Sequence, residues 1–127
     1  AAGVREDVIE AGAHTDRLAA YVRGNLAFLA ENPVRVRALA EIFTSFRGED
    51  GRLAYDESQV DSVVGPLEEL LRAGQADGEL RAFDAHVMAR TIRAAIDAVT
   101  PQLGVRDLDV PAYAEELVET FTRATRA

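Results

Sequence analysis

Apolar side chains recur three and four residues apart along nearly the whole chain, and alternating runs of Val, Ile and Thr between tight turns are missing. The first pattern places apolar side chains on one face of an α-helix, whereas the second is typical of half-buried strands. The sequence therefore predicts an all-α fold. Since 127 residues are enough for one buried core, we expect residues 1–127 to form a single helical domain.

We expect five helices after a lead-in, residues 1–13, which we interpret as the tail of a helix that starts upstream. The first full helix begins near Thr15 or Asp16, either of which can cap it. The second begins at Asn32 and ends at Gly48. The first of these helices carries the apolar stripe Leu18, Tyr21, Val22, Leu26 and Leu29, and the second carries Leu39, Ile42, Phe43 and Phe46.

The third predicted helix contains proline. Because proline lacks a backbone N–H and its ring displaces a carbonyl of the preceding turn, Pro66 predicts a kink. We expect Gly74 to end this helix in the left-handed conformation, Asp77-Gly78 to form a turn and Leu80 to enter the core. The side chains predicted to be buried are Val60, Val63, Val64, Leu67, Leu70 and Leu71.

The last two helices carry unusually broad apolar faces. Asp84 caps the fourth helix, which runs to about Thr100, and Asp109 caps the fifth, with Pro111 in its first turn. The apolar arc covers roughly half of the fourth helix, more than the ~100° stripe of a surface helix. Two such helices fit a dimeric four-helix bundle, although a compact monomer could also bury both faces. The predicted interface residues are Val87, Thr91, Ala98, Ala114, Val118 and Phe121.

The charge of the chain limits its partners. The net charge of −8 repels nucleic acid, because phosphate binding needs a basic surface. The chain has no cysteine, which excludes a disulfide framework and a thiol nucleophile. No apolar run is long enough to cross a bilayer, so we expect no membrane partner and a cytoplasmic protein.

The sequence offers little for catalysis. No nucleophile motif and no phosphate-binding loop is present, and carboxylates adjacent on a helix, such as Glu68 and Glu69, point about 100° apart. His14 and His86 are far apart in the chain and lack metal-ligand spacing. We therefore expect no enzyme, no cofactor and no metal, with His86 facing solvent in the first turn of the fourth helix.

One segment resembles a known family. Leu70 to Arg81 reads LLRAGQADGELR and precedes the alanine-rich helix that Asp84 caps. This pattern is similar to the C-terminal domain of TetR-family transcriptional regulators. The ENP start of the second helix and the final YAEELVETF helix follow in the order which that family uses, so the resemblance covers nearly the whole chain.

The resemblance implies a function. It implies a ligand-responsive regulator, most often a repressor, whose C-terminal domain binds a small apolar or amphipathic effector and forms a homodimer through its last two helices. Operator DNA would be bound only by a helix-turn-helix domain that this sequence does not contain, and residues 1–13 would lead from it. The residues predicted to line the effector pocket are Tyr21, Phe28, Val64, Leu67, Leu71, Met88 and Ile92.

Two alternatives remain open at this stage. Each predicted pocket residue could be an ordinary core residue, since apolar side chains at helical spacing are typical of both. A stand-alone helical module that binds a protein partner and no small molecule is the second candidate function.

Overall fold

The chain is all-helical in the parts that the computed structural model describes, residues 13–32, 57–103 and 107–127. These residues form the α-helices α2 (His14–Glu31), α4 (Glu57–Ala76), α5 (Ala85–Asp97) and α6 (Val110–Thr125), and the 3-10 helix η1 (Thr100–Gln102). Four of the five predicted helices are therefore seen. The lead-in up to Gly12 and the predicted second helix after Asn32 lie outside the described residues. Asn32, the predicted start of that helix, is the C-cap residue of α2, and its backbone N–H donates to the Leu29 carbonyl.

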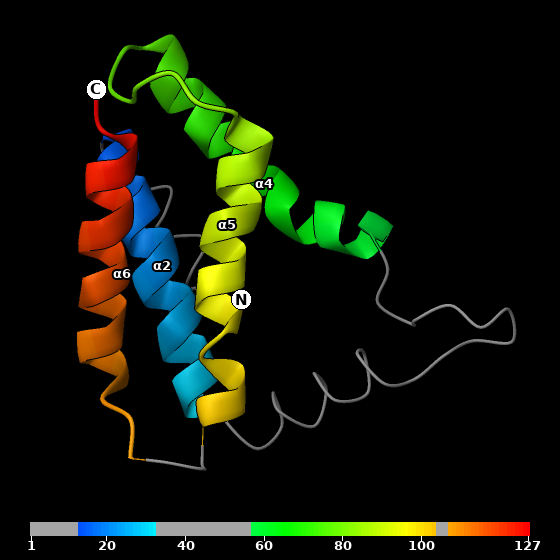
Figure 1. The fold of residues 1–127 in the computed structure, drawn as a ribbon, viewed down its shortest axis with the longest axis vertical. Helices are drawn as coiled ribbons and strands as arrows, with labels where there is room; N and C mark the ends of the chain where they lie inside the picture. Colours follow the sequence, from blue (N-terminus) through cyan, green and yellow to red (C-terminus); the bar gives the residue numbers. More distant parts are fainter. Residues whose placement is uncertain (1–12, 33–56, 104–106) are drawn as a thin grey trace, which may run out of the picture.

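Helix α2 is at the centre of the arrangement (Figure 1). It packs against α6 on one side and against α4 and α5 on the other, and α4 and α5 also pack against each other. Residues from all four helices and from the turn before α5 contribute to one core. Its buried members are Leu18, Val22, Leu26, Leu29, Val64, Leu67, Leu71, Leu80, Ala85, Ala89, Ile92, Ile96, Val99, Leu103, Ala114 and Phe121.

The predicted starts of the last two helices are confirmed. The Asp84 carboxylate accepts the backbone N–H of Val87, and the Asp109 carboxylate accepts that of Ala112, both at 3.0 Å. These bonds satisfy amide groups that have no partner within the first helical turn. Helix α5 ends at Asp97, earlier than predicted, and the chain continues as η1. Pro101 explains the change, because it has no N–H to donate to the carbonyl four residues before it.

Three predictions about the first half of the described chain are wrong. Gly74 is helical and α4 continues to Ala76, whereas Gly78 takes the positive φ of 83°. Val63 is 39 % exposed, because its neighbour Val64 faces the core. Neither Thr15 nor Asp16 caps α2; its N-cap residue is Ala13, whose own side chain makes no capping hydrogen bond.

Helix α4 continues through its proline. Pro66 lies inside the helix, and the ribbon of α4 changes direction between its two ends (Figure 1). Of the other residues predicted to face the core from α4, Leu67 and Leu71 are buried and Leu70 packs against the core from a half-buried position. The side chain of Val60, also predicted to be buried, lies outside the described residues. Among residues 62–76 of α4, the buried face therefore contains Val64, Leu67 and Leu71.

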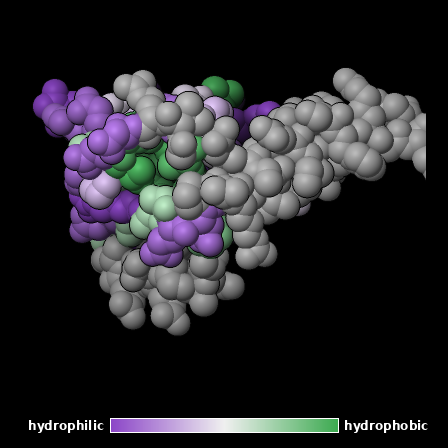
Figure 2. All heavy atoms as spheres, turned by 90° about the horizontal axis from the view of Figure 1, so that it is seen from below, coloured by the Kyte–Doolittle hydropathy of each residue, from purple (hydrophilic) through white to green (hydrophobic). Residues whose placement is uncertain are grey.

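The end of the molecule away from that turn is partly apolar. Seen from below, hydrophobic side chains gather near the middle of the face, with hydrophilic side chains beside them (Figure 2). Among the described helices, none has both the length and the apolar character needed for a membrane span.

Candidate functional site

The residues predicted to line an effector pocket come together from three helices, with one exception. Val64, Leu67 and Leu71 of α4 and Ile92 of α5 are each at most 1 % exposed and belong to the same core cluster. Tyr21 of α2 and Met88 of α5 are partly buried and pack against that cluster. Phe28 is 44 % exposed. The fold therefore places six of the seven residues, which come from α2, α4 and α5, in or against the one core that all four described helices share.

A partly buried polar group, the Arg93 guanidinium, borders this core between α2 and α5. The Arg93 guanidinium donates to the Tyr21 hydroxyl at 3.3 Å and to the Asn25 side-chain oxygen at 2.9 Å. It also forms an ion pair with Asp97, with Nη2 and Oδ1 2.8 Å apart. Burial alone would lower the pKa of Arg93, but Asp97 and Tyr21 outweigh it and raise the pKa. Arg93 therefore remains a cation, and the Tyr21 hydroxyl accepts one of its hydrogen bonds.

The residues predicted for a dimer interface separate into two groups. Val87 and Thr91 of α5 and Ala98, the residue that follows this helix, are exposed, with Val87 at 58 %. On α6, Ala114 and Phe121 are buried and Val118 packs against the core from a half-buried position. The broad apolar face of α5 thus leaves a stripe in solvent, whereas that of α6 is mostly used inside the chain, against α2.

The segment that connects α4 to α5, residues 77–84, is held by a side chain near the end of α4 and by one of its own. We refer to it as the α4–α5 turn. The Gln75 amide donates to the backbone carbonyls of Arg81 and Phe83, at 3.1 and 2.9 Å. The Arg81 side chain donates to the Ala124 carbonyl at the end of α6 and lies over the ring of Phe83, 5.3 Å from its centroid. These contacts fix the path of the turn.

Glu79 in this turn caps the start of α2. One of its oxygens accepts the backbone N–H of His14 and the other that of Thr15, both at 2.9 Å. The first amides of a helix lack partners within it and carry a partial positive charge, so a carboxylate is favourable there. The backbone bond from Thr15 is the main cause that lowers the pKa of Glu79 to about 2.

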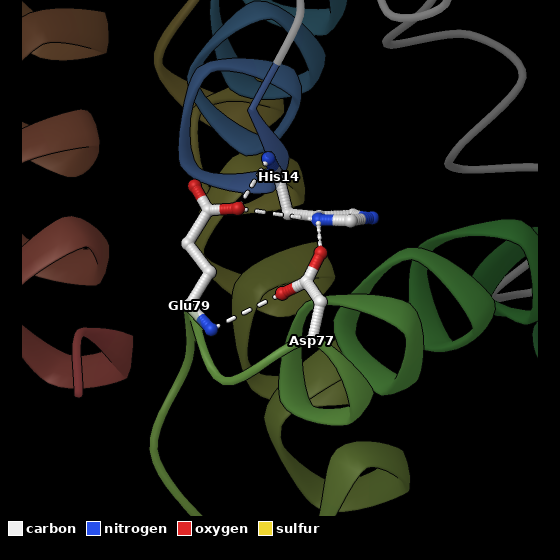
Figure 3. Close-up of side chains that lie close together, drawn as sticks. All are labelled: His14, Asp77 and Glu79. Atoms are coloured by element: carbon white, nitrogen blue, oxygen red, sulfur yellow. Dashed lines mark hydrogen bonds and ion pairs between the residues drawn. The ribbon is translucent and has the colours of Figure 1, made fainter.

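The same carboxylate lies next to a histidine and a second carboxylate (Figure 3). His14 Nδ1 is 2.8 Å from Asp77 Oδ2 and 3.2 Å from Glu79 Oε2. The other oxygen of Asp77 accepts the backbone N–H of Glu79 at 3.1 Å. One imidazole nitrogen and two carboxylate oxygens therefore converge, and atoms of these kinds are metal ligands in proteins.

Sequence reasoning missed this cluster. His86, the other histidine, is in the first turn of α5 as predicted and has its side chain 44 % exposed, with Nδ1 3.2 Å from Glu68 Oε2. His14 is 63 residues before Asp77, so no local spacing signals their contact. The only sequence signal was the charged Asp77-Gly78-Glu79 pattern, whose partner depends on the fold.

Comparisons with models of known protein families, with curated proteins and with solved structures found no match.

Proposed function

We propose that this chain is the effector-binding and dimerising part of a ligand-responsive transcriptional regulator, in which another domain would contact DNA. The observation that carries the proposal is the convergence of six predicted pocket residues, from α2, α4 and α5, on one apolar cluster bordered by Tyr21, Asn25 and Arg93. Sites for small molecules combine an apolar lining with a few placed polar groups. The effector that fits is a small amphipathic molecule with an apolar body and one hydrogen-bonding end.

The negative net charge supports the proposal that another domain, and not this chain, binds DNA. With a net charge of −8, the chain disfavours contact with phosphates, which a regulator would leave to a basic domain. The exposed stripe of Val87, Thr91 and Ala98 on α5 supports association with a second copy through the last two helices. We infer a homodimer whose interface includes this stripe.

The effector site is tested by exchanging Tyr21 for Phe, which removes the hydroxyl and keeps the ring. Small molecules that copurify with the protein are first identified by mass spectrometry, and their affinity is then measured by calorimetry. Tyr21→Phe should weaken binding roughly fivefold to tenfold, the value of one hydrogen bond. The matched control is Tyr113→Phe on α6, which should bind as the unchanged protein does. Equal affinities in all three proteins would place the effector elsewhere.

Dimerisation is tested by a charge on the exposed stripe of α5. Val87→Glu should convert a particle of twice 13.8 kDa into one of 13.8 kDa in light scattering. Val63→Glu is the matched control, because Val63 is an exposed valine of α4 outside the predicted interface. A single 13.8 kDa species for the unchanged chain at high concentration would reject the dimer.

A helical module that binds a protein partner is the second candidate. Its support is the complete burial of Leu71 and Ile92, which leaves them without exposed surface, as in an ordinary core. Under this alternative no small molecule copurifies, and Val87→Glu weakens binding to a protein partner.

A further inference from the structure

The start of α2 and the α4–α5 turn bring three ligand-type atoms together from distant parts of the chain. These atoms are Nδ1 of His14, Oδ2 of Asp77 and Oε2 of Glu79, and they lie within 4.8 Å of one another. Around a tetrahedral ion with bonds of about 2.0–2.1 Å, two ligand atoms lie about 3.3 Å apart. The 2.8 and 3.2 Å distances from His14 are close to that value, and the two carboxylate oxygens lie within 4.8 Å of each other.

Backbone groups fix the two carboxylates in place. Glu79 accepts the amides of His14 and Thr15. Asp77 accepts the amide of Glu79 through Oδ1 (Figure 3). The Asp77 Oδ2 atom is therefore left toward the imidazole, while Glu79 Oε2 serves both the His14 amide and the cluster. Hydrogen bonds of this kind hold ligands in metal sites, where they orient the atoms that bind the ion.

The contacts of the His14 ring suit a divalent cation better than a single hydrogen on Nδ1. Nδ1 carries at most one hydrogen, yet it faces an oxygen of Asp77 and an oxygen of Glu79. A single N–H cannot be directed fully at both acceptors. A divalent cation can bind both oxygens and the nitrogen lone pair together, and its charge balances the two carboxylates.

We propose that His14, Asp77 and Glu79 form a binding site for a divalent transition-metal ion of the Zn²⁺ type. A mixed set of one imidazole and two carboxylates suits Zn²⁺ and its neighbours better than Mg²⁺ or Ca²⁺, which prefer oxygen ligands alone. Three protein ligands leave a coordination position for water. The Asp77 side chain is 49 % exposed, which gives the ion a path from solvent.

The site joins the first turn of α2 to the α4–α5 turn, so bound metal should stabilise that end of the fold. This inference is independent of the regulator proposal, because it concerns neither the core cluster nor the stripe on α5. A failed metal titration leaves the effector tests unchanged, and a failed effector test leaves this site unchanged.

The experiment titrates untagged, chelator-treated protein with ZnCl₂ by calorimetry, with visible absorption of Co²⁺ as a second readout. We expect one ion per chain with micromolar or tighter affinity. Asp77→Asn and His14→Gln should each weaken binding by at least about tenfold. The matched control is His86→Gln, since His86 also lies 3.2 Å from a carboxylate oxygen but has only Glu68 beside it in that ion pair.

Several outcomes overturn the proposal. It is wrong if the unchanged protein takes up no Zn²⁺ at micromolar concentration, or if His86→Gln removes binding as strongly as His14→Gln. It is also wrong if Mg²⁺ displaces Zn²⁺ at equal concentration, because that would show a site of oxygen ligands alone. Asp77→Asn keeps Oδ1 for the Glu79 amide, and the melting curve of each metal-free variant identifies any loss of folding.

Discussion

The α4–α5 turn and the outer face of α5 are adjacent in the chain but differ in how they are held. The turn is fixed by directional contacts with both neighbouring segments, among them the Glu79 bonds to α2 and the Arg81 bond to α6. The face of Val87, Thr91 and Ala98 is exposed. Changes in the turn should therefore act on the stability of one chain, whereas changes on the face should act on its association with another molecule.

The largest effect should come from Leu80, whose side chain is 4 % exposed and enters the core from the turn. Leu80→Ala should lower the free energy of unfolding by about 2–5 kcal/mol, because the removed methyl groups leave a cavity. Urea denaturation measures the change. A loss below about 1 kcal/mol would mean that the turn is not coupled to the core, and the contrast with α5 would fail.

Gly74 should show how closely the turn packs on α4. A Cβ atom at Gly74 would lie 2.6 Å from Leu80 Cδ1 and 2.7 Å from Leu80 Cγ. Gly74→Ala should therefore destabilise the chain by about 1–3 kcal/mol, although alanine normally favours a helix by about 1 kcal/mol. The double-mutant cycle is the control. In a Leu80→Ala background the same change should be neutral or stabilising, and an unchanged cost there would contradict the contact.

Glu79 should make the stability of the contact between the α4–α5 turn and the start of α2 depend on pH. Its pKa is about 2 in the folded chain, against an ordinary value of 4.5. A lowered pKa means that the native state favours the carboxylate, so the stabilisation is full above about pH 4.5 and is lost as the pH falls toward 2. Glu79→Gln should therefore lower the free energy of unfolding at pH 7 by less than about 2 kcal/mol, the range for the loss of a helix cap. The difference from the unchanged protein should become smaller as the pH falls.

That comparison is made in chelating buffer, with urea midpoints between pH 7 and pH 3. Glu116→Gln, a change at an exposed glutamate of α6, is the matched control. A difference between Glu79→Gln and the unchanged protein that stays constant over this range would show that the carboxylate charge does not stabilise α2.

The smallest effect on stability is expected on the face of α5. Val87 is 58 % exposed, so Val87→Glu should change the unfolding free energy by no more than about 0.5 kcal/mol in the monomer. Denaturation at low protein concentration, where any dimer dissociates, measures this. A large loss there would show that Val87 is part of the fold of a single chain.

Local signals in the sequence predicted much of this fold. Asp84 and Asp109 each accept an amide only three residues further along the chain, and Leu80 lies in the turn that brings it into the core. Each could therefore be identified from its neighbours. Glu79, which caps α2, could not be identified in this way, because it is 64 residues after Thr15. Val63 and Val64 are both apolar, and only packing decides which of them faces the core.

For the candidate sites, too, some features could be predicted from local sequence and others depended on the tertiary fold. Val64, Leu67, Leu71 and Ile92 were recognisable as inward-facing from helical spacing, but whether they contact an effector depends on shapes that spacing does not specify. Gly74 was assigned a left-handed conformation because glycine often ends helices, whereas here the close approach of Leu80 is what excludes a larger residue. The cluster of His14, Asp77 and Glu79 needed the tertiary fold to become visible.

Glu79 also holds the chain after α6, because its backbone carbonyl accepts the N–H of Ala127 while its side chain binds the start of α2. One residue thus links two segments more than a hundred positions apart. If the turn opens, the amides of His14, Thr15 and Ala127 should lose protection together. Hydrogen exchange would then report a single cooperative opening at this end of the molecule, in place of independent fraying of two helix termini.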